Sequence, residues 1–167
     1  SNWQELFKDW KRARWEFVTL QLGVKEKNLR WREHNEQERS FYSKWTEDLE
    51  YNFPFGFKEL WGLSYRTDYD LKQHAKHAGK VLEINDPETN EKVVPHVIEP
   101  AVGINRLFLM VLNDAYTQEG ERTILKLHPR LAPYKVAVFP LLKNKPELIE
   151  KAQEVYKMLK ESIDGIV

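Results

Sequence analysis

Residues 47–65, EDLEYNFPFGFKELWGLSY, decide how this chain is expected to fold. Two runs rich in aromatic and aliphatic residues, 47–53 and 57–65, flank a short Pro-Phe-Gly connection at 54–56. Such runs around a Pro/Gly connection are typical of two antiparallel strands joined as a hairpin. We therefore predict a hairpin here, within an antiparallel sheet.

Alternation along the second run assigns its side chains to the two sides of the strand. It predicts that Glu59 and Trp61 share one side and that Gly62 lies on the other. A glycine leaves its side open, as a flat ligand such as a nucleobase requires. Arg66 ends the run beside the next helix. The alternative is a hairpin followed by a capped helix, with no ligand.

Helices and further strands are expected on both sides of the hairpin. Apolar residues at spacings of three and four predict a helix from Trp3 to about Leu20, which Asn2 would cap and Gly23 would end. Alternation predicts a strand over 29–34 with one aromatic and one cationic side. The remaining elements expected before residue 128 are helices at 36–45, 67–79 and 103–116, and strands at 80–86, 92–99 and 122–127.

The pattern changes near residues 128–133. Residues 134–142 form a continuous apolar run, which predicts a buried strand, and an amphipathic helix follows from Pro146. Residues 162–167 are expected to begin another strand. The predicted fold class is α+β: an antiparallel sheet with flanking helices over 1–130, then the first β-α unit of an α/β domain over 131–167.

Bulk composition excludes several classes of protein. Lysine and arginine total 26, as do aspartate and glutamate, so no global basic field favours nucleic acid. There is no cysteine, which excludes disulfides and thiolate chemistry. No apolar run approaches the length that spans a membrane, and the first residues do not have the pattern of a signal peptide.

The stretch EPAVGINRLFLMVL, residues 99–112, places Arg106 at the start of an apolar helix. A guanidinium cannot be neutralised by a pKa shift, and a cation in a first helical turn opposes the helix dipole. A bound phosphate would compensate both costs, and Gly103 would let a ligand approach the backbone. The alternative is an ion pair between Arg106 and Glu99 or another carboxylate.

Three further patterns carry less weight. Asp70, His74 and His77 share a helix face at metal-ligand spacing, but a solvated polar face is the preferred interpretation. The tryptophans of the first helix, including Trp3, are suited to stacking on nucleobases, but core packing is preferred. Asp114 follows the apolar helix and is expected at the surface.

Three ordered blocks, 42–74, 93–116 and 125–141, resemble the homodimeric class II glycyl-tRNA synthetases. VIEPAVGINR (97–106) looks like motif 3 of that family, and APYKVAVFPL (132–141) looks like the opening of its anticodon-binding domain. The resemblance implies the activation of glycine with ATP and Mg²⁺, transfer to tRNA(Gly), a homodimeric parent protein and a cytoplasmic location.

The same resemblance implies a role for each matching residue. Arg106 would contact the γ-phosphate of ATP, and Glu59 would lie near the nucleotide and its Mg²⁺. Glu99 would face the amino group of glycine, and Arg66 would lie at the glycine end of the pocket. Ala101 stands where the family usually has serine, so the small pocket is kept but a hydroxyl is lost.

The family's motifs 1 and 2 are absent from this sequence. The chain is therefore expected to be an interior part of a longer ligase, with little or no activity by itself. The alternative is a non-catalytic synthetase-like module that binds or assists.

Overall fold

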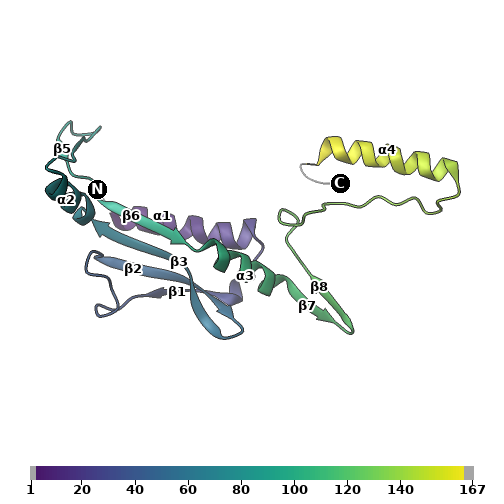
Figure 1. Ribbon diagram of the computed structural model, residues 1–167, viewed down its shortest axis with the longest axis horizontal. Coiled ribbons are helices and arrows are strands. Elements are labelled where there is room, and N and C mark those ends of the chain that lie inside the picture. The colour runs from purple at the N-terminus through teal and green to yellow at the C-terminus, as the bar shows by residue number, and fades with distance from the viewer. Residues whose placement is uncertain (1–2, 164–167) are drawn as a thin grey trace. The chain divides into compact units, whose positions relative to one another are not determined.

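The computed structural model describes residues 3–163, which form two compact units, one up to Tyr116 and one from Thr117 onward. The first unit is built on an antiparallel sheet with the strand order β1-β2-β3-β6 (Figure 1). The hairpin of β2 and β3 lies at its centre and is confirmed, and Gly56 takes the positive φ of +95° that the turn requires. The four strands are β1 (Leu29–Glu33), β2 (Trp45–Phe53), β3 (Gly56–Thr67) and β6 (Val97–Val102).

Three of the predicted helices are confirmed in the first unit. The first, α1, runs from Trp3 to Glu16 and continues as a π-helical turn, η1, to a left-handed Gly23. The second ends at Gly79, whose φ of +62° closes the last turn. The remaining elements of this unit are η1 (Phe17–Gln21), η2 (Glu26–Asn28), α2 (Tyr69–Ala78), β4 (Ile84–Asn85), β5 (Lys92–Val93) and α3 (Ile104–Ala115).

The core lies on one face of the sheet, beneath α1, η1 and α3. From α1, Phe7 packs against Leu63 and Tyr65, and Trp3 stacks on the Tyr65 ring at 4.2 Å. A second cluster joins η1 and α3 to the hairpin, and Met110 is completely buried in it. Since this packing uses only one face of each strand, the opposite face remains for polar groups.

Asp114, expected at the surface, is buried beside this core with only 6 % of its side chain exposed. Its carboxylate accepts hydrogen bonds from the Asn28 amide at 2.6 Å, the Tyr51 hydroxyl at 3.2 Å and the Lys25 backbone N–H at 3.3 Å. Burial raises the pKa of Tyr51. The surface expectation was wrong because the partners of Asp114 come from distant segments that its local sequence does not reveal.

The helix predicted over 36–45 is wrong, because residues 36–44 form a loop and Trp45 begins β2. The Asn35 side chain accepts hydrogen bonds from the backbone N–H groups of Gln37 and Glu38. Arg39 donates to the Lys44 carbonyl at 2.6 Å and to the His34 carbonyl at 3.3 Å. Asn35 and Glu38 thus form the capping pattern of a helix start, but only one turn follows, closed by the Arg39 N–H bond to the Asn35 carbonyl at 3.1 Å.

The second unit contains a hairpin and one long helix. Its elements are β7 (Tyr116–Glu119), which begins at the last residue of the first unit, β8 (Arg122–Leu125) and α4 (Pro146–Ser162). The strand predicted over 134–142 is wrong, because this segment forms no strand ladder with any residue in the described range. Without such a partner its apolar side chains stay exposed, as at Phe139 and Leu141. The synthetase domain boundary expected near residue 130 stays a prediction.

Two expectations fall on the chain ends. The cap at Asn2 and most of the strand predicted for 162–167 lie outside the described residues. Within 3–163, no helix combines the length and the apolar character needed to cross a membrane.

Candidate active site

The sheet face opposite α1 is polar. Registers place Arg32 beside Asp48, Asp48 beside Gly62, and Gly62 beside Ala101, in one row across all four strands. Neighbouring rows add further charged and small residues on the same side. We call this surface the polar face; it comprises Arg30, Arg32, Thr46, Asp48, Glu50, Glu59, Gly62, Ser64, Glu99 and Ala101.

A β-bulge decides which way Glu59 points. Leu49 pairs with Trp61 and Glu50 pairs with Glu59, so Leu60 is an extra residue on β3. Leu60 and Trp61 are both buried on the core side. The predicted placement of Glu59 beside Trp61 is therefore wrong, because the bulge moves Glu59 to the polar face. A Cβ added at Gly62 would lie 3.7 Å from Glu59 Oε1.

Arg106 reaches the polar face from the first turn of α3. Its guanidinium donates to the Glu59 carbonyl at 3.0 Å and lies 3.1 Å from Glu59 Oε2. An ion pair was the alternative considered for this arginine, and it forms with Glu59 rather than with Glu99. Both side chains are about half exposed, so each remains accessible to a ligand. Gly103 precedes the helix, and the three atoms nearest to a Cβ there would all belong to the Arg106 side chain.

Arg66 and Glu99 meet at the other end of the polar face. Arg66 donates to Glu99 at 2.5 Å and forms two hydrogen bonds with Asp70, at 2.7 and 2.9 Å. The guanidinium lies 4.1 Å from the centre of the Tyr42 ring. The hydrogen bonds that Arg66 donates to Asp70 and Glu99 raise the pKa of Arg66, and Arg66 in turn lowers the pKa of Asp70.

Asp48 lies between two arginine clusters, that of Arg106 with Glu59 and that of Arg66 with Glu99. The sequence analysis missed it. Its side chain is 7 % exposed, and Oδ2 lies 2.7 Å from His34 Nε2. Burial raises the pKa of Asp48, although the hydrogen bond with His34 acts in the opposite direction. Its Oδ1 would lie 3.6 Å from a Cβ at Gly62. The alternation of 46, 48 and 50 was the available signal, since it places three polar residues on one side of a strand.

Glu50 is the second buried carboxylate that the sequence analysis missed. Arg30 donates to it at 2.7 Å and Arg32 at 3.0 Å. Glu50 is also the direct cross-strand neighbour of Glu59. Three arginines and two adjacent carboxylates thus lie at the Arg106 end of the polar face, an arrangement suited to a phosphate chain with a divalent cation.

The pattern of Asp70, His74 and His77 does not form a metal site. Asp70 is bound to Arg66, and residues 3–163 contain no group of three or more His, Asp or Glu side chains arranged to hold a metal ion.

Asp70→Asn is expected to lower the stability of the chain at pH 7 by about 1 kcal/mol, since it weakens a partly exposed bidentate pair. Because Arg66 lowers the pKa of Asp70, the ionised carboxylate stabilises the fold above its ordinary pKa, and this contribution is lost as the pH falls through the folded value. Urea unfolding at several pH values from 7 to 2 should show that the difference in free energy of unfolding between wild type and variant disappears in acid. The control is Asp9→Asn, whose exposed pair with Arg12 should give a much smaller gap.

Comparison with known proteins finds similar proteins that share one name. It is 52 % identical over 160 residues to "Glycine--tRNA ligase" of Clostridium tetani, covering 93 % of this chain and 34 % of that protein. The proteins of the same name from Clostridium perfringens and Staphylococcus epidermidis are 51 % and 46 % identical, over 93 % and 96 % of this chain and 34 % and 35 % of their own length. No protein-family model matches.

The chain thus spans about a third of the length of the curated relatives it matches. Identity is near one half and extends over 93–96 % of this chain. The chain belongs to the glycine–tRNA ligase family.

Proposed function

We propose that the polar face is part of the active site of a glycine–tRNA ligase. In this proposal the parent protein is a class II synthetase and homodimer that activates glycine with ATP in the cytoplasm and transfers it to tRNA(Gly). The row Asp48–Gly62–Ala101 between two arginine clusters is the observation that supports it best. It provides the smallest side chains at the place where a small amino acid would lie.

The two ends of the polar face suit different parts of the reaction. Activation joins the carboxylate of glycine to the α-phosphate of ATP and releases pyrophosphate. Cations must balance the phosphates, and an anion must face the ammonium group. Arg106 would bind the γ-phosphate, and Glu99 and Asp48 would face the ammonium. Arg66 would orient Glu99 and remain fixed itself by Asp70.

Selection of glycine would depend on exclusion. With no side chain at Gly62 and only a methyl group at Ala101, this row would leave room for glycine, and each larger amino acid would have to displace Asp48 or Glu59. Ala101 offers no hydroxyl, so the polar contacts to the substrate would come from the carboxylates.

The residues at the Arg106 end also fit Mg²⁺. Glu50 and Glu59 are adjacent carboxylates, and Glu59 is half exposed. Hard oxygen ligands of this kind are the ones that Mg²⁺ takes together with substrate phosphates. When bound, Mg²⁺ would neutralise charge on the phosphates, and Glu59 would hold it while paired with Arg106.

The test is glycine-dependent exchange of pyrophosphate into ATP by the protein expressed at its full natural length. Arg106→Ala should lower kcat/KM for ATP roughly tenfold or more, because it removes a charge-assisted contact to phosphate. Arg12→Ala, which removes an exposed arginine of α1, is the matched control and should leave exchange unchanged. For the 167-residue chain alone we expect little or no exchange.

Two outcomes would contradict the proposal. Full-length protein without glycine-dependent exchange would favour the accessory-module alternative. Unchanged ATP kinetics in Arg106→Ala would remove the phosphate role from that residue.

A further inference from the structure

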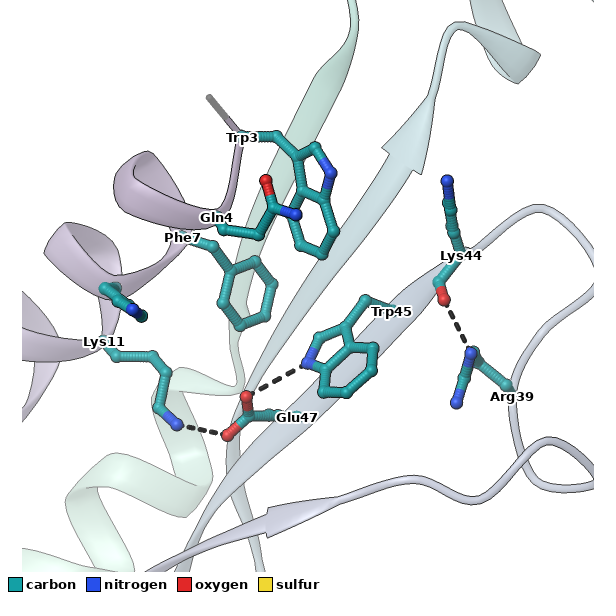
Figure 2. A pocket seen from close by; sticks show the side chains of 9 residues that line it. Trp3, Gln4, Phe7, Lys11, Arg39, Lys44, Trp45 and Glu47 are labelled. Carbon is teal, nitrogen blue, oxygen red and sulfur yellow. Dashed lines mark hydrogen bonds and ion pairs between the residues drawn. The ribbon is translucent and has the colours of Figure 1, made fainter. Parts of the chain in front are cut away.

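A cavity lies on the core side of the sheet, between the start of α1 and the start of β2. Figure 2 shows its wall of aromatic rings from Trp3, Phe7 and Trp45. It encloses about 590 Å³, within the range of sites that hold small ligands or single anchoring side chains. Its lining residues are Trp3, Gln4, Phe7, Lys8, Lys11, Arg39, Lys44, Trp45 and Glu47. We call it the tryptophan pocket.

The tryptophan pocket is separate from the polar face. Trp45 and Glu47 pair with Tyr65 and Leu63, whose side chains belong to the core side. Thr46 alternates with them and points to the opposite side. A ligand in the pocket therefore lies across the sheet from the site proposed for glycine and ATP.

The aromatic wall is preformed. One face of Trp3 is stacked on Tyr65, with ring planes 10° apart, and Phe7 meets Trp3 edge-on and is 3 % exposed. Arg39 lies 5.5 Å from the Trp45 ring and is itself tied to the Lys44 carbonyl. Because these rings are already held in place, the binding of an apolar side chain between them would cost little conformational entropy in the pocket.

The rim of the pocket is positively charged. Its carboxylate, Glu47, is paired with Lys11 and accepts a hydrogen bond from the Trp45 indole at 3.1 Å (Figure 2). Lys8 and Lys44 are exposed, and neither side chain has a hydrogen-bond or ion-pair partner in the described part of the chain. With Arg39, three cations remain around an apolar cavity without a carboxylate to balance them.

We propose that the tryptophan pocket binds an acidic protein segment, with an aromatic side chain between Trp3 and Trp45 and carboxylates on Lys8 and Lys44. Charge complementarity and the aromatic wall define this occupant. Single-stranded RNA is the less favoured partner. It needs open aromatic faces and a continuous cationic track, whereas here one face of Trp3 is covered and only two lysines are unpaired.

The experiment titrates the ¹⁵N-labelled 167-residue chain with a blocked pentapeptide, a central phenylalanine between two glutamates on each side. The indole N–H signals of Trp3 and Trp45 should move in a saturable way. Peptides with lysine in place of glutamate, or alanine in place of phenylalanine, should move them much less. A decauridylate is titrated in parallel and should leave both signals in place.

Charge reversal at the rim tests the lysines. Lys8→Glu with Lys44→Glu should weaken peptide binding roughly tenfold, an effect typical of charge pairs at an interface rim. The matched control, Lys76→Glu with Lys80→Glu, makes the same change in net charge on exposed residues outside the pocket and should leave binding unchanged. Lys8→Gln with Lys44→Gln removes both charges without reversing them and should give an intermediate loss of peptide affinity. This pair keeps the test valid if the double glutamate variant does not fold.

Three results would overturn the proposal. The first is no saturable shift with the acidic peptide, and the second is equal affinity in the rim and control variants. The third is a shift with decauridylate but not with the peptide, which would make the pocket an RNA contact. None of them depends on pyrophosphate exchange, so the proposed ligase function is tested separately.

Discussion

Asp114→Ala is expected to destabilise the chain by about 3 kcal/mol, because it removes a buried charge and leaves its donors unpaired. The Asn28 amide, the Tyr51 hydroxyl and the Lys25 N–H all lose their acceptor. A loss of this size raises the ratio of unfolded to folded chain roughly a hundredfold and lowers Tm by roughly 10 °C. Urea unfolding followed by tryptophan fluorescence measures it directly.

Two variants make this result specific to the Asp114 hydrogen bonds. Asp114→Asn keeps an acceptor for Asn28 and Tyr51 but turns an amide toward Lys25. Its free energy of unfolding should therefore lie between those of wild type and Asp114→Ala. Glu154→Ala removes an exposed carboxylate of α4 and should change stability by less than about 0.5 kcal/mol. Asp114→Ala with the stability of wild type would show that these hydrogen bonds do not hold η2 to the hairpin.

Gly62→Ala is expected to separate activity from stability. A Cβ at this position makes only ordinary contacts, 3.6 Å from Asp48 Oδ1 and 3.7 Å from Glu59 Oε1, and the strand backbone accepts any residue. The added methyl group nevertheless occupies the place proposed for glycine. In the full-length protein, kcat/KM for glycine should fall about 10- to 100-fold, the usual effect of one misplaced methyl group in a small pocket.

Gly56→Ala is the matched contrast to Gly62→Ala, because it should lower stability and leave activity unchanged. With φ at +95°, an alanine here is strained and should cost about 1–2 kcal/mol, while glycine kinetics stay unchanged. Pyrophosphate exchange at varied glycine concentration, together with urea unfolding, measures both quantities for both variants. Normal glycine kinetics in Gly62→Ala would show that the substrate does not lie on this row.

Much of the framework could be predicted from local sequence. The Pro-Phe-Gly connection fixed the hairpin, apolar spacing fixed α1 and α3, and Gly79 ended α2 where a left-handed residue was needed. These signals act over a few residues and are strong enough to survive tertiary packing. The position of Arg106 at the start of an apolar helix indicated a phosphate site, the resemblance to glycyl-tRNA synthetases supplied roles for Arg66 and Glu99, and all three roles await the experiments above.

Contacts between distant segments could not be predicted in this way. Asp114 is buried because Lys25, Asn28 and Tyr51 converge on it, and no periodicity records that. The segment after Asn35 begins with helix-capping bonds, but it leaves the helical path after one turn, where Arg39 binds the carbonyls of His34 and Lys44. The segment 134–142 has the composition of a strand, but strand formation also requires a neighbouring strand to pair with.

The bulge in β3 also sets where this hairpin tolerates a change in length. Leu60 is the surplus residue, since Leu49 and Glu50 on β2 already face Trp61 and Glu59. A chain lacking Leu60 would regain a regular ladder between β2 and β3, and all the remaining side chains would keep their present faces. It would lose one buried leucine and the local kink. Removing a residue from the opposite stretch of β2 would instead exchange core and solvent side chains along the rest of that strand.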